Sequence, residues 1–367
     1  MTIRVAIPDL ISPSYFPAIA AVELGFLPDA KLELLYPVTK TYEELREGRL
    51  DFVGGASHAV LYAFKDWQGA KLLCALAQRM YWFLVVHRKF NPRAGDLGVV
   101  KGLRIGAAPG PVDGLRQMLK RAGIPDVQIG PVPGVVGEKA SFGLMAAKAL
   151  AEEKLDGFWA NGMGAEVAVR EGVGTVVLDA RRDGSPEVKG YTFPALVCTD
   201  KTIRERPQLA QAALKAIVAT HKALKEDPKR ATAVAERHFP PMETSLIAEL
   251  IRRDAPYYQH GIALKTVESM NRFAQDIGLL SRPVKYEEVV WTPDWRARSR
   301  SSPAPAAASG RRWPGAWRRM VPPSSSQTSR DSIPRPPSSP RSPERARSAC
   351  KSTWQRSGTW SAWRLRR

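Results

Sequence analysis

The sequence predicts an α/β protein with two similar lobes. A short phrase occurs twice, 105 positions apart, at residues 45–52 and 150–158. Each copy combines a charged helix end, a Leu-Asp turn and a short strand, and a loop of small and polar residues follows each strand. Predicted strands and helices alternate around both copies, which is the order of an α/β fold. A chain that builds the same strand and loop twice is expected to form two lobes with the functional cleft between them.

The first lobe begins with a strand at the very start of the chain. A loop at residues 13–16 leads into the first helix, which Gly25 ends. In chain order, the predicted elements of this part are a strand at 5–7, a helix at 17–24, a strand at 31–36, a helix at 42–46, a strand at 52–54, a helix at 59–64, and strands at 72–77 and 82–87.

The second lobe starts after a loop at residues 89–98. Its predicted elements are a strand at 103–107, a helix at 114–122, a strand at 128–132, a helix at 143–152, the repeated strand near 158, and a strand at 175–178. The chain then passes through an apolar run at 192–199 and is almost wholly helical to residue 280. We expect these helices to return to the first lobe, so that crossings near 86–92 and 188–194 form a hinge. The predicted lobes are therefore residues 1–88 with 192–293, and residues 89–191.

Charge divides the chain sharply. The net charge of +19 suggests a nucleic-acid binder until it is counted by segment. Residues 1–295 hold 38 Lys and Arg against 34 Asp and Glu, whereas residues 296–367 hold 17 against 2. The basicity belongs to the tail, and the nearly neutral body is not expected to bind nucleic acid.

The tail has the composition of a disordered segment. It contains 16 Arg, 16 Ser and 10 Pro among 72 residues, with five Trp and almost no aliphatic periodicity. Residues 294–367 therefore cannot bury enough apolar surface to fold alone. Basic runs with interleaved aromatics can bind single strands, but an abrupt change of composition after a complete domain favours a shifted reading frame of GC-rich DNA. The nucleotide sequence near Trp295 would distinguish the two explanations.

No metal, redox or cofactor site is predicted. Cys74 and Cys198 lie in apolar runs, Cys350 lies in the tail, and no Cys/His spacing links them. The first strand has no basic segment and apolar leader ahead of it, so the chain as written is expected in the cytoplasm. No apolar run approaches the length that a bilayer span needs.

The order of several short motifs resembles a known family. These motifs are Tyr15-Phe16-Pro17-Ala18 leading to Glu23-Leu24-Gly25-Phe26, the phrase at 44–52, Lys101-Gly102-Leu103-Arg104-Ile105-Gly106, and Cys198-Thr199-Asp200 leading to Arg206-Pro207. Over residues 3–290 they resemble the substrate-binding proteins of nitrate-, sulfonate- and taurine-type ABC importers, the SsuA/THI5-like (NMT1-type) group. The resemblance implies a type II periplasmic-binding-protein fold, with two doubly wound lobes and a hinge of two crossings.

The resemblance also implies a function. A protein of this group lies in the periplasm, where it captures a small solute in the cleft and closes its lobes around it. It then delivers the solute to the membrane permease of an ABC importer. Ligands of doubly wound sheets lie beyond the carboxyl ends of the strands, where helix N-termini favour an anionic group. We therefore expect a monomer that binds a small organic anion, such as a sulfonate, an aromatic carboxylate or a pyrimidine-like compound.

The candidate ligand-binding residues lie in the loops that meet this condition. Residues 109–113 lie between a strand and a helix N-terminus and are expected to be the main anion cradle. The candidates are Asp9, Ser12, Tyr15, Ser57, His58, Arg79 and Trp82 before residue 88, and Gly110, Val112, Asp113, Trp159 and Asn161 in the second lobe.

Several candidates also have a structural explanation. Arg79 could pair with a ligand carboxylate through its planar fork, or it could form an ordinary salt bridge. His58 could contact the ligand, although a histidine at a helix start more often satisfies local backbone groups. Trp82 could stack on the ligand or pack in the hinge, whereas Trp159 directly follows the repeated strand and is the better stacking candidate.

Two alternatives remain open. The pyrimidine precursor synthases of the same group are cytosolic enzymes that use pyridoxal phosphate, a histidine and a cysteine-rich motif. Here His58 lies one position from that histidine, but the segment before Cys198 lacks the cysteine cluster, so we expect a binding protein and not an enzyme. A cytoplasmic ligand sensor is the second alternative.

Overall fold

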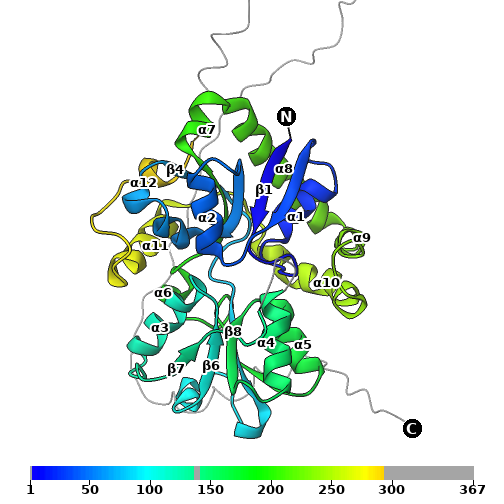
Figure 1. Ribbon diagram of the computed structural model, residues 1–367, viewed down its shortest axis with the longest axis vertical. Helices are drawn as coiled ribbons and strands as arrows, with labels where there is room; N and C mark the ends of the chain where they lie inside the picture. Colours follow the sequence, from blue (N-terminus) through cyan, green and yellow to red (C-terminus); the bar gives the residue numbers. More distant parts are fainter. Residues whose placement is uncertain (1, 136–140, 293–367) are drawn as a thin grey trace, which may run out of the picture. The chain divides into compact units, whose positions relative to one another are not determined.

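The computed structural model describes residues 2–135 and 141–292, which form two lobes around two five-stranded sheets (Figure 1). The first sheet has the order β2-β1-β3-β10-β4 and the second has the order β7-β6-β8-β5-β9. The strands of the first sheet are β1 (Ile3–Ile7), β2 (Ala30–Leu34), β3 (Phe52–Ala56), β4 (Ala70–Ala75) and β10 (Pro194–Thr199). Those of the second are β5 (Phe83–His87), β6 (Arg104–Ala107), β7 (Gln128–Gly130), β8 (Gly157–Ala160) and β9 (Gly174–Asp179). The predicted tail, 294–367, lies outside the described residues.

The two sheets have the same pairing pattern. In the first, β1 pairs in parallel with β2 and β3, and in the second β6 pairs in parallel with β7 and β8. One antiparallel strand then enters each sheet, β10 between β3 and β4 and β5 between β8 and β9. The predicted duplication of an α/β unit is therefore confirmed.

The repeated Leu-Asp turn makes the same contacts in both lobes. The Asp51 carboxylate accepts a hydrogen bond from the Arg4 backbone N–H at 2.8 Å, and the Asp51 N–H donates to the Arg4 carbonyl at 3.0 Å. In the second lobe, Asp156 accepts from the Arg104 N–H at 3.0 Å and donates to the Arg104 carbonyl at 2.9 Å. Each aspartate thus joins the turn to the first strand of its own sheet, the structural role that a turn aspartate commonly has.

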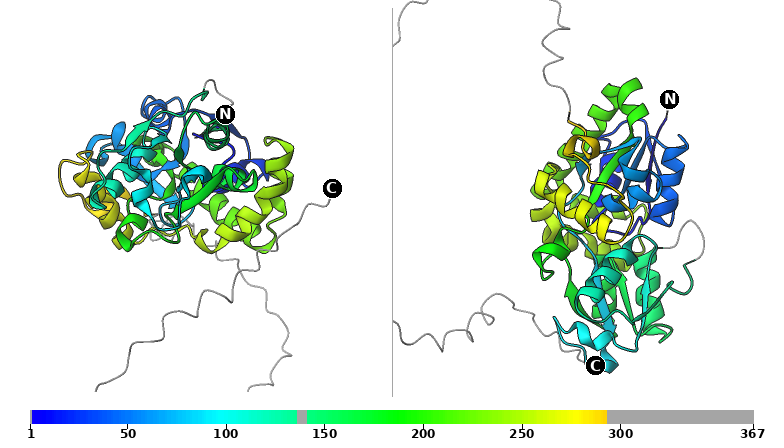
Figure 2. Two further views of the ribbon diagram at one scale, coloured as in Figure 1. Left: turned by 90° about the horizontal axis from the view of Figure 1, so that it is seen from below. Right: turned by 90° about the vertical axis from the view of Figure 1, so that its left-hand side faces the viewer.

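Helices cover both sheets. Those of the first lobe are α1 (Phe16–Glu23), α2 (Val38–Arg46), α7 (Asp200–Glu205), α8 (Pro207–Glu226), α9 (Arg230–Ala235), α10 (Pro241–Asp254), α11 (Leu264–Asp276) and α12 (Tyr286–Val289). The second lobe has α3 (Pro111–Arg121), α4 (Phe142–Ala151) and α5 (Gly162–Arg170), and α6 (Pro186–Lys189) lies in the connection back to the first lobe. Figures 1 and 2 show the yellow helices α11 and α12 beside the blue, N-terminal part of the chain, as expected for helices that return to the first lobe. No helix of the described ranges is both long and apolar enough for a membrane span.

The first crossing differs from the prediction. The chain leaves the first sheet after β4 and enters the second at β5, so it crosses within residues 76–82 and not near 86–92. A short, mainly apolar strand fits the interior of either sheet equally well, so its sequence does not indicate which sheet it joins. The second crossing spans residues 180–193, and a hydrogen bond from Met80 N–H to the Lys189 carbonyl at 3.0 Å joins the two crossings. The helix expected at 59–64 is a 3₁₀ segment at Ser57–Tyr62.

The repeated turn yields a first test. Asp156→Asn removes one of the two acceptor oxygens that hold the start of β6, so the free energy of unfolding should fall by about 1–2 kcal/mol in urea titrations. Asp126→Asn changes an exposed aspartate of the same lobe and serves as the control. Equal stabilities of the two variants would contradict the role of the turn.

Candidate functional site

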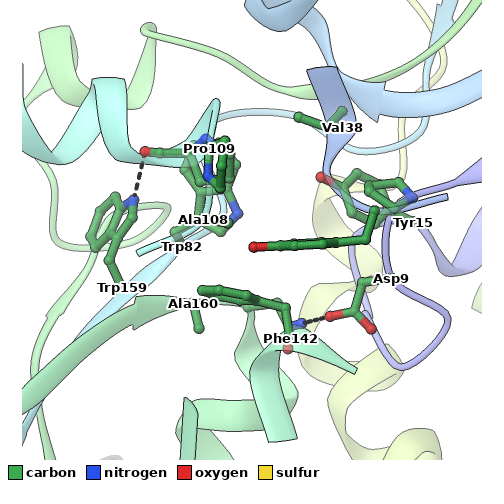
Figure 3. A pocket seen from close by; sticks show the side chains of 13 residues that line it. Asp9, Tyr15, Val38, Trp82, Ala108, Pro109, Phe142, Trp159 and Ala160 are labelled. Atoms are coloured by element: carbon green, nitrogen blue, oxygen red, sulfur yellow. Dashed lines mark hydrogen bonds between the residues drawn. The ribbon is translucent and has the colours of Figure 1, made fainter. Parts of the chain in front are cut away.

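A cavity lies between the two lobes, at the carboxyl ends of β1, β6 and β8 (Figure 3). The cavity leaves about 40 Å³ for the centres of water-sized molecules, and the wider space around it, which includes open solvent, is about 410 Å³. Pro8, Asp9, Tyr15, Tyr36 and Val38 line it from the first lobe, Trp82 from the first crossing, and Ala108, Pro109, Pro111, Phe142, Trp159, Ala160 and Asn161 from the second. This is where a doubly wound fold places its ligand.

Aromatic rings form much of the wall. Tyr36 and Phe142, one from each lobe, are stacked with their centroids 5.9 Å apart and their planes at 16°. Trp82 and Trp159 lie 6.1 Å apart, and the Trp159 indole N–H donates to the Pro111 carbonyl at 3.0 Å. Figure 3 shows the Tyr15, Trp82, Phe142 and Trp159 rings on different sides of the cavity. Rings held in this way suit a flat, largely apolar solute.

Asp9 connects the lobes at this cavity. It follows β1, and its carboxylate accepts from the Ile11 N–H at 2.9 Å within the first lobe. The same carboxylate accepts from the Asn161 side-chain amide at 2.8 Å and from the Gly143 N–H at 3.4 Å in the second lobe. Burial raises the pKa of Asp9 to about 6, and these hydrogen bonds oppose the rise because they favour the ionised form.

The second lobe presents two helix N-termini to Asp9. Asn161 caps α5, since its side-chain oxygen accepts from the N–H groups of Met163 at 2.9 Å and Gly164 at 3.2 Å, which leaves its amide N–H for Asp9. Gly143 lies in the first turn of α4, and a Cβ there would come within 2.8 Å of the Asn161 side chain. Glycine at this position therefore lets both helix starts reach one carboxylate, where their dipoles favour negative charge.

Five of the predicted site residues line the cavity, and seven do not. Asp9, Tyr15, Trp82, Trp159 and Asn161 are brought together. The structure places Ser12, Ser57, His58, Arg79, Gly110, Val112 and Asp113 outside the lining.

Ser57 and His58 hold the second crossing. The Ser57 hydroxyl lies 3.1 Å from the Thr192 hydroxyl, and His58 Nδ1 lies 2.9 Å from the same oxygen. His58 Nε2 lies 3.2 Å from the Gly110 carbonyl in the second lobe. Gly110 has φ +85, and a Cβ would come within 2.8 Å of the Val38 side chain, so glycine permits this close approach.

The organic anion expected from the sequence would meet no cationic side chain among the described residues of this cavity. Arg79 is exposed, with its guanidinium carbon 5.4 Å from the Tyr257 ring centroid. No Lys, Arg or His is among the described residues of the lining. The expected cradle at 109–113 also has few free amides. Pro111 has no N–H, and the N–H groups of Val112 and Asp113 bond to the carbonyls of Ala108 and Gly110 at 3.0 and 3.1 Å.

Tyr36 and Phe142 line the cavity but are not among the residues predicted from the sequence. Tyr36 stands just beyond the end of β2, and Phe142 is the first residue of α4. Both positions satisfy the rule that the cleft lies at carboxyl strand ends and helix N-termini. Applying that rule to β2 and α4, and not only to the repeated loops, would have found them.

No family model and no curated protein matches the chain. Among solved structures, a protein from Bordetella bronchiseptica RB50 has a TM-score of 0.62 at 18% identity, covering 81% of this chain and 96% of that one. The alkanesulfonate-binding protein SsuA from Xanthomonas axonopodis pv. citri, bound to MOPS, has a TM-score of 0.59 at 14% identity, covering 79% and 98%. The fold is that of the SsuA-type periplasmic binding proteins.

A third structure with this fold is an enzyme. A mutant of DszB in complex with biphenyl-2-sulfinic acid has a TM-score of 0.55 at 16% identity, covering 82% of this chain and 99% of that one. The SsuA-type fold thus accommodates both binding and catalysis, and the cavity residues must distinguish them.

The cavity offers little to a covalent mechanism. Cys74 and Cys198 are buried in β4 and β10, where burial raises the pKa of each thiol, and neither lines the cavity. The described ranges also contain no cluster of three or more His, Cys, Asp or Glu that could hold a metal. Asp9 is the one carboxylic acid among the described lining residues.

The raised pKa of Asp9 predicts a pH dependence of stability. The folded protein holds the Asp9 proton more tightly than the unfolded chain, whose pKa is near 3.8. The stabilisation is therefore complete below that value and is lost as pH rises through about 6. Relative to Asp9→Asn, the wild-type free energy of unfolding should fall by roughly 2–3 kcal/mol over this window. Urea unfolding of both proteins at several pH values measures it, and a difference that does not change with pH would contradict the assignment.

Proposed function

We propose that the protein is a solute-binding protein of an ABC importer that encloses a small planar solute between its lobes. The observation that carries the proposal is the aromatic cavity at the strand ends of two lobes connected by two chain crossings. Two lobes that meet around a cavity can open and close about such crossings, which is how periplasmic binding proteins capture their ligands.

Polar contacts across the cleft support a closed state. The Tyr62 hydroxyl of the first lobe donates to Asp113 of the second at 2.8 Å. On the outer side, Arg253 of α10 lies 3.3 Å from Glu166 of α5, and Arg121 of α3 lies 2.8 Å from Asp276 of α11. Exposed ion pairs of this kind contribute little individually. They are therefore compatible with reopening when the solute is released.

The lining favours binding over catalysis. A synthase or hydrolase of this fold needs a nucleophile or a base that touches the substrate. The described lining has no Cys, His or Lys, and its tyrosines stay neutral because burial raises the pKa of Tyr36 to about 12 and that of Tyr15 further. Its one carboxylate, Asp9, accepts hydrogen bonds from protein donors on both lobes, which hold it in place as a structural and binding group. Delivery to a permease and a periplasmic location follow from the proposed role.

The stacked pair at the cavity provides the test. A thermal-shift screen of planar aromatic solutes first identifies a solute that stabilises the protein. Phe142→Ala removes the second-lobe ring of the pair, so the dissociation constant for that solute should rise about tenfold or more, mainly through faster release. Phe90→Ala, a half-buried ring of the same lobe outside the lining, is the matched control. Unchanged binding in Phe142→Ala, or equal losses in both variants, would contradict the proposed site.

A further inference from the structure

The charge of the cavity differs from that of an anion-binding site. Asp9 is the one charged side chain in the described part of the lining, and no ion pair to it occurs among the described residues. It is 5% exposed. A buried carboxylate is costly unless it is paired or hydrogen-bonded. Hydrogen bonds satisfy Asp9, but they supply no opposite charge.

Asp9 also occupies the place where an anionic ligand would bind. In this fold, an anion is favoured where helix N-termini meet the cleft. Here the Gly143 N–H of α4 and the Asn161 cap of α5 donate to Asp9 at 3.4 and 2.8 Å. A carboxylate or sulfonate at this position would have to displace Asp9 or lie beside a like charge.

The walls favour the opposite charge. Tyr15, Tyr36, Trp82, Phe142 and Trp159 present aromatic rings to the cavity. The face of an aromatic ring carries partial negative charge and attracts cations, most strongly at Trp and Tyr and where water is excluded. A buried carboxylate surrounded by such rings is a suitable environment for a flat cationic group.

We propose that the cavity takes a planar aromatic cation, such as an amidine or a protonated amine on a flat ring, and rejects organic anions, with Asp9 as the residue that sets this specificity. The inference rests on the proposed function and replaces the organic anion expected from the family resemblance. The cation supplies the countercharge that Asp9 lacks, and the rings enclose its flat body.

A matched set of probes tests the charge preference. Benzamidine, benzamide and benzoate have the same planar shape and carry positive, zero and negative charge at neutral pH, and the corresponding naphthalene compounds extend the set to a larger ring. Isothermal titration should give a dissociation constant at least tenfold lower for the amidine than for the amide, with the carboxylate weakest. Equal or tighter binding of the carboxylates would overturn the inference but leave the proposed function standing. Binding of none of the probes would contradict both.

Two variants test the role of Asp9. Asp9→Asn should reduce the affinity for the amidine at least tenfold. It should also reduce the difference in affinity between the amidine and the carboxylate. Asp66→Asn removes another buried acid of the first lobe, which accepts hydrogen bonds from Ser281 outside the lining, and should leave the difference in affinity between amidine and carboxylate unchanged. Thermal unfolding of each variant establishes that it is folded.

The wild-type protein supplies a measurement that depends on no variant. Benzamidine stays charged throughout the neutral and mildly acidic range, so its affinity should fall as pH decreases through the pKa of Asp9. A pH-independent affinity, or an Asp9→Asn variant that keeps the full preference for the amidine, would overturn the inference.

Discussion

The hydrogen bonding of Asp9 is the constraint on which the organisation of the cleft depends. A carboxylate that is 5% exposed needs donors, and here the second lobe supplies two of them through Asn161 and Gly143. Those donors reach it because α4 and α5 pack closely at Gly143 and Gly164, where a Cβ would clash with the neighbouring helix or its cap. The burial of Asp9 and its hydrogen bonds to the second lobe therefore act together on the positions of the lobes, the charge of the cavity and the pKa of Asp9.

The duplicated scaffold explains why this contact lies at the cavity. Asp9 follows β1 and Asn161 follows β8, so each residue stands at the carboxyl end of a parallel strand in its own sheet. Each sheet is completed by an antiparallel strand that comes directly from a crossing, β5 or β10. Movement about the crossings would consequently separate or join the strand ends that form the cavity, and this would couple the proposed capture of a solute to the relative position of the lobes.

The sequence was sufficient for the fold class and the general position of the site. The repeated phrase identified two lobes because a Leu-Asp turn before a strand is a local feature, and Asp51 and Asp156 do make equivalent contacts. The sheet that β5 joins was not predictable, since pairing of an apolar strand is decided by tertiary contacts. The hydrogen bond between Asp9 and Asn161 was not predictable either, because the two residues are 152 positions apart in the chain. Arg79 was a candidate for a ligand contact, with an ordinary salt bridge as the alternative, but it is exposed, with its backbone at φ 67 and its guanidinium near the Tyr257 ring.

A double-mutant cycle between Asp9 and Asn161 tests this account most directly. The free energies of unfolding of the wild type, Asp9→Ala, Asn161→Ala and the double variant give the coupling energy of the pair, separately from the capping role that Asn161 has in α5. Above pH 7, where Asp9 is ionised, we predict a coupling of about 1–3 kcal/mol, the range of a hydrogen bond to a charged group. A coupling near zero would show that the two lobes do not meet at this carboxylate and would contradict the account.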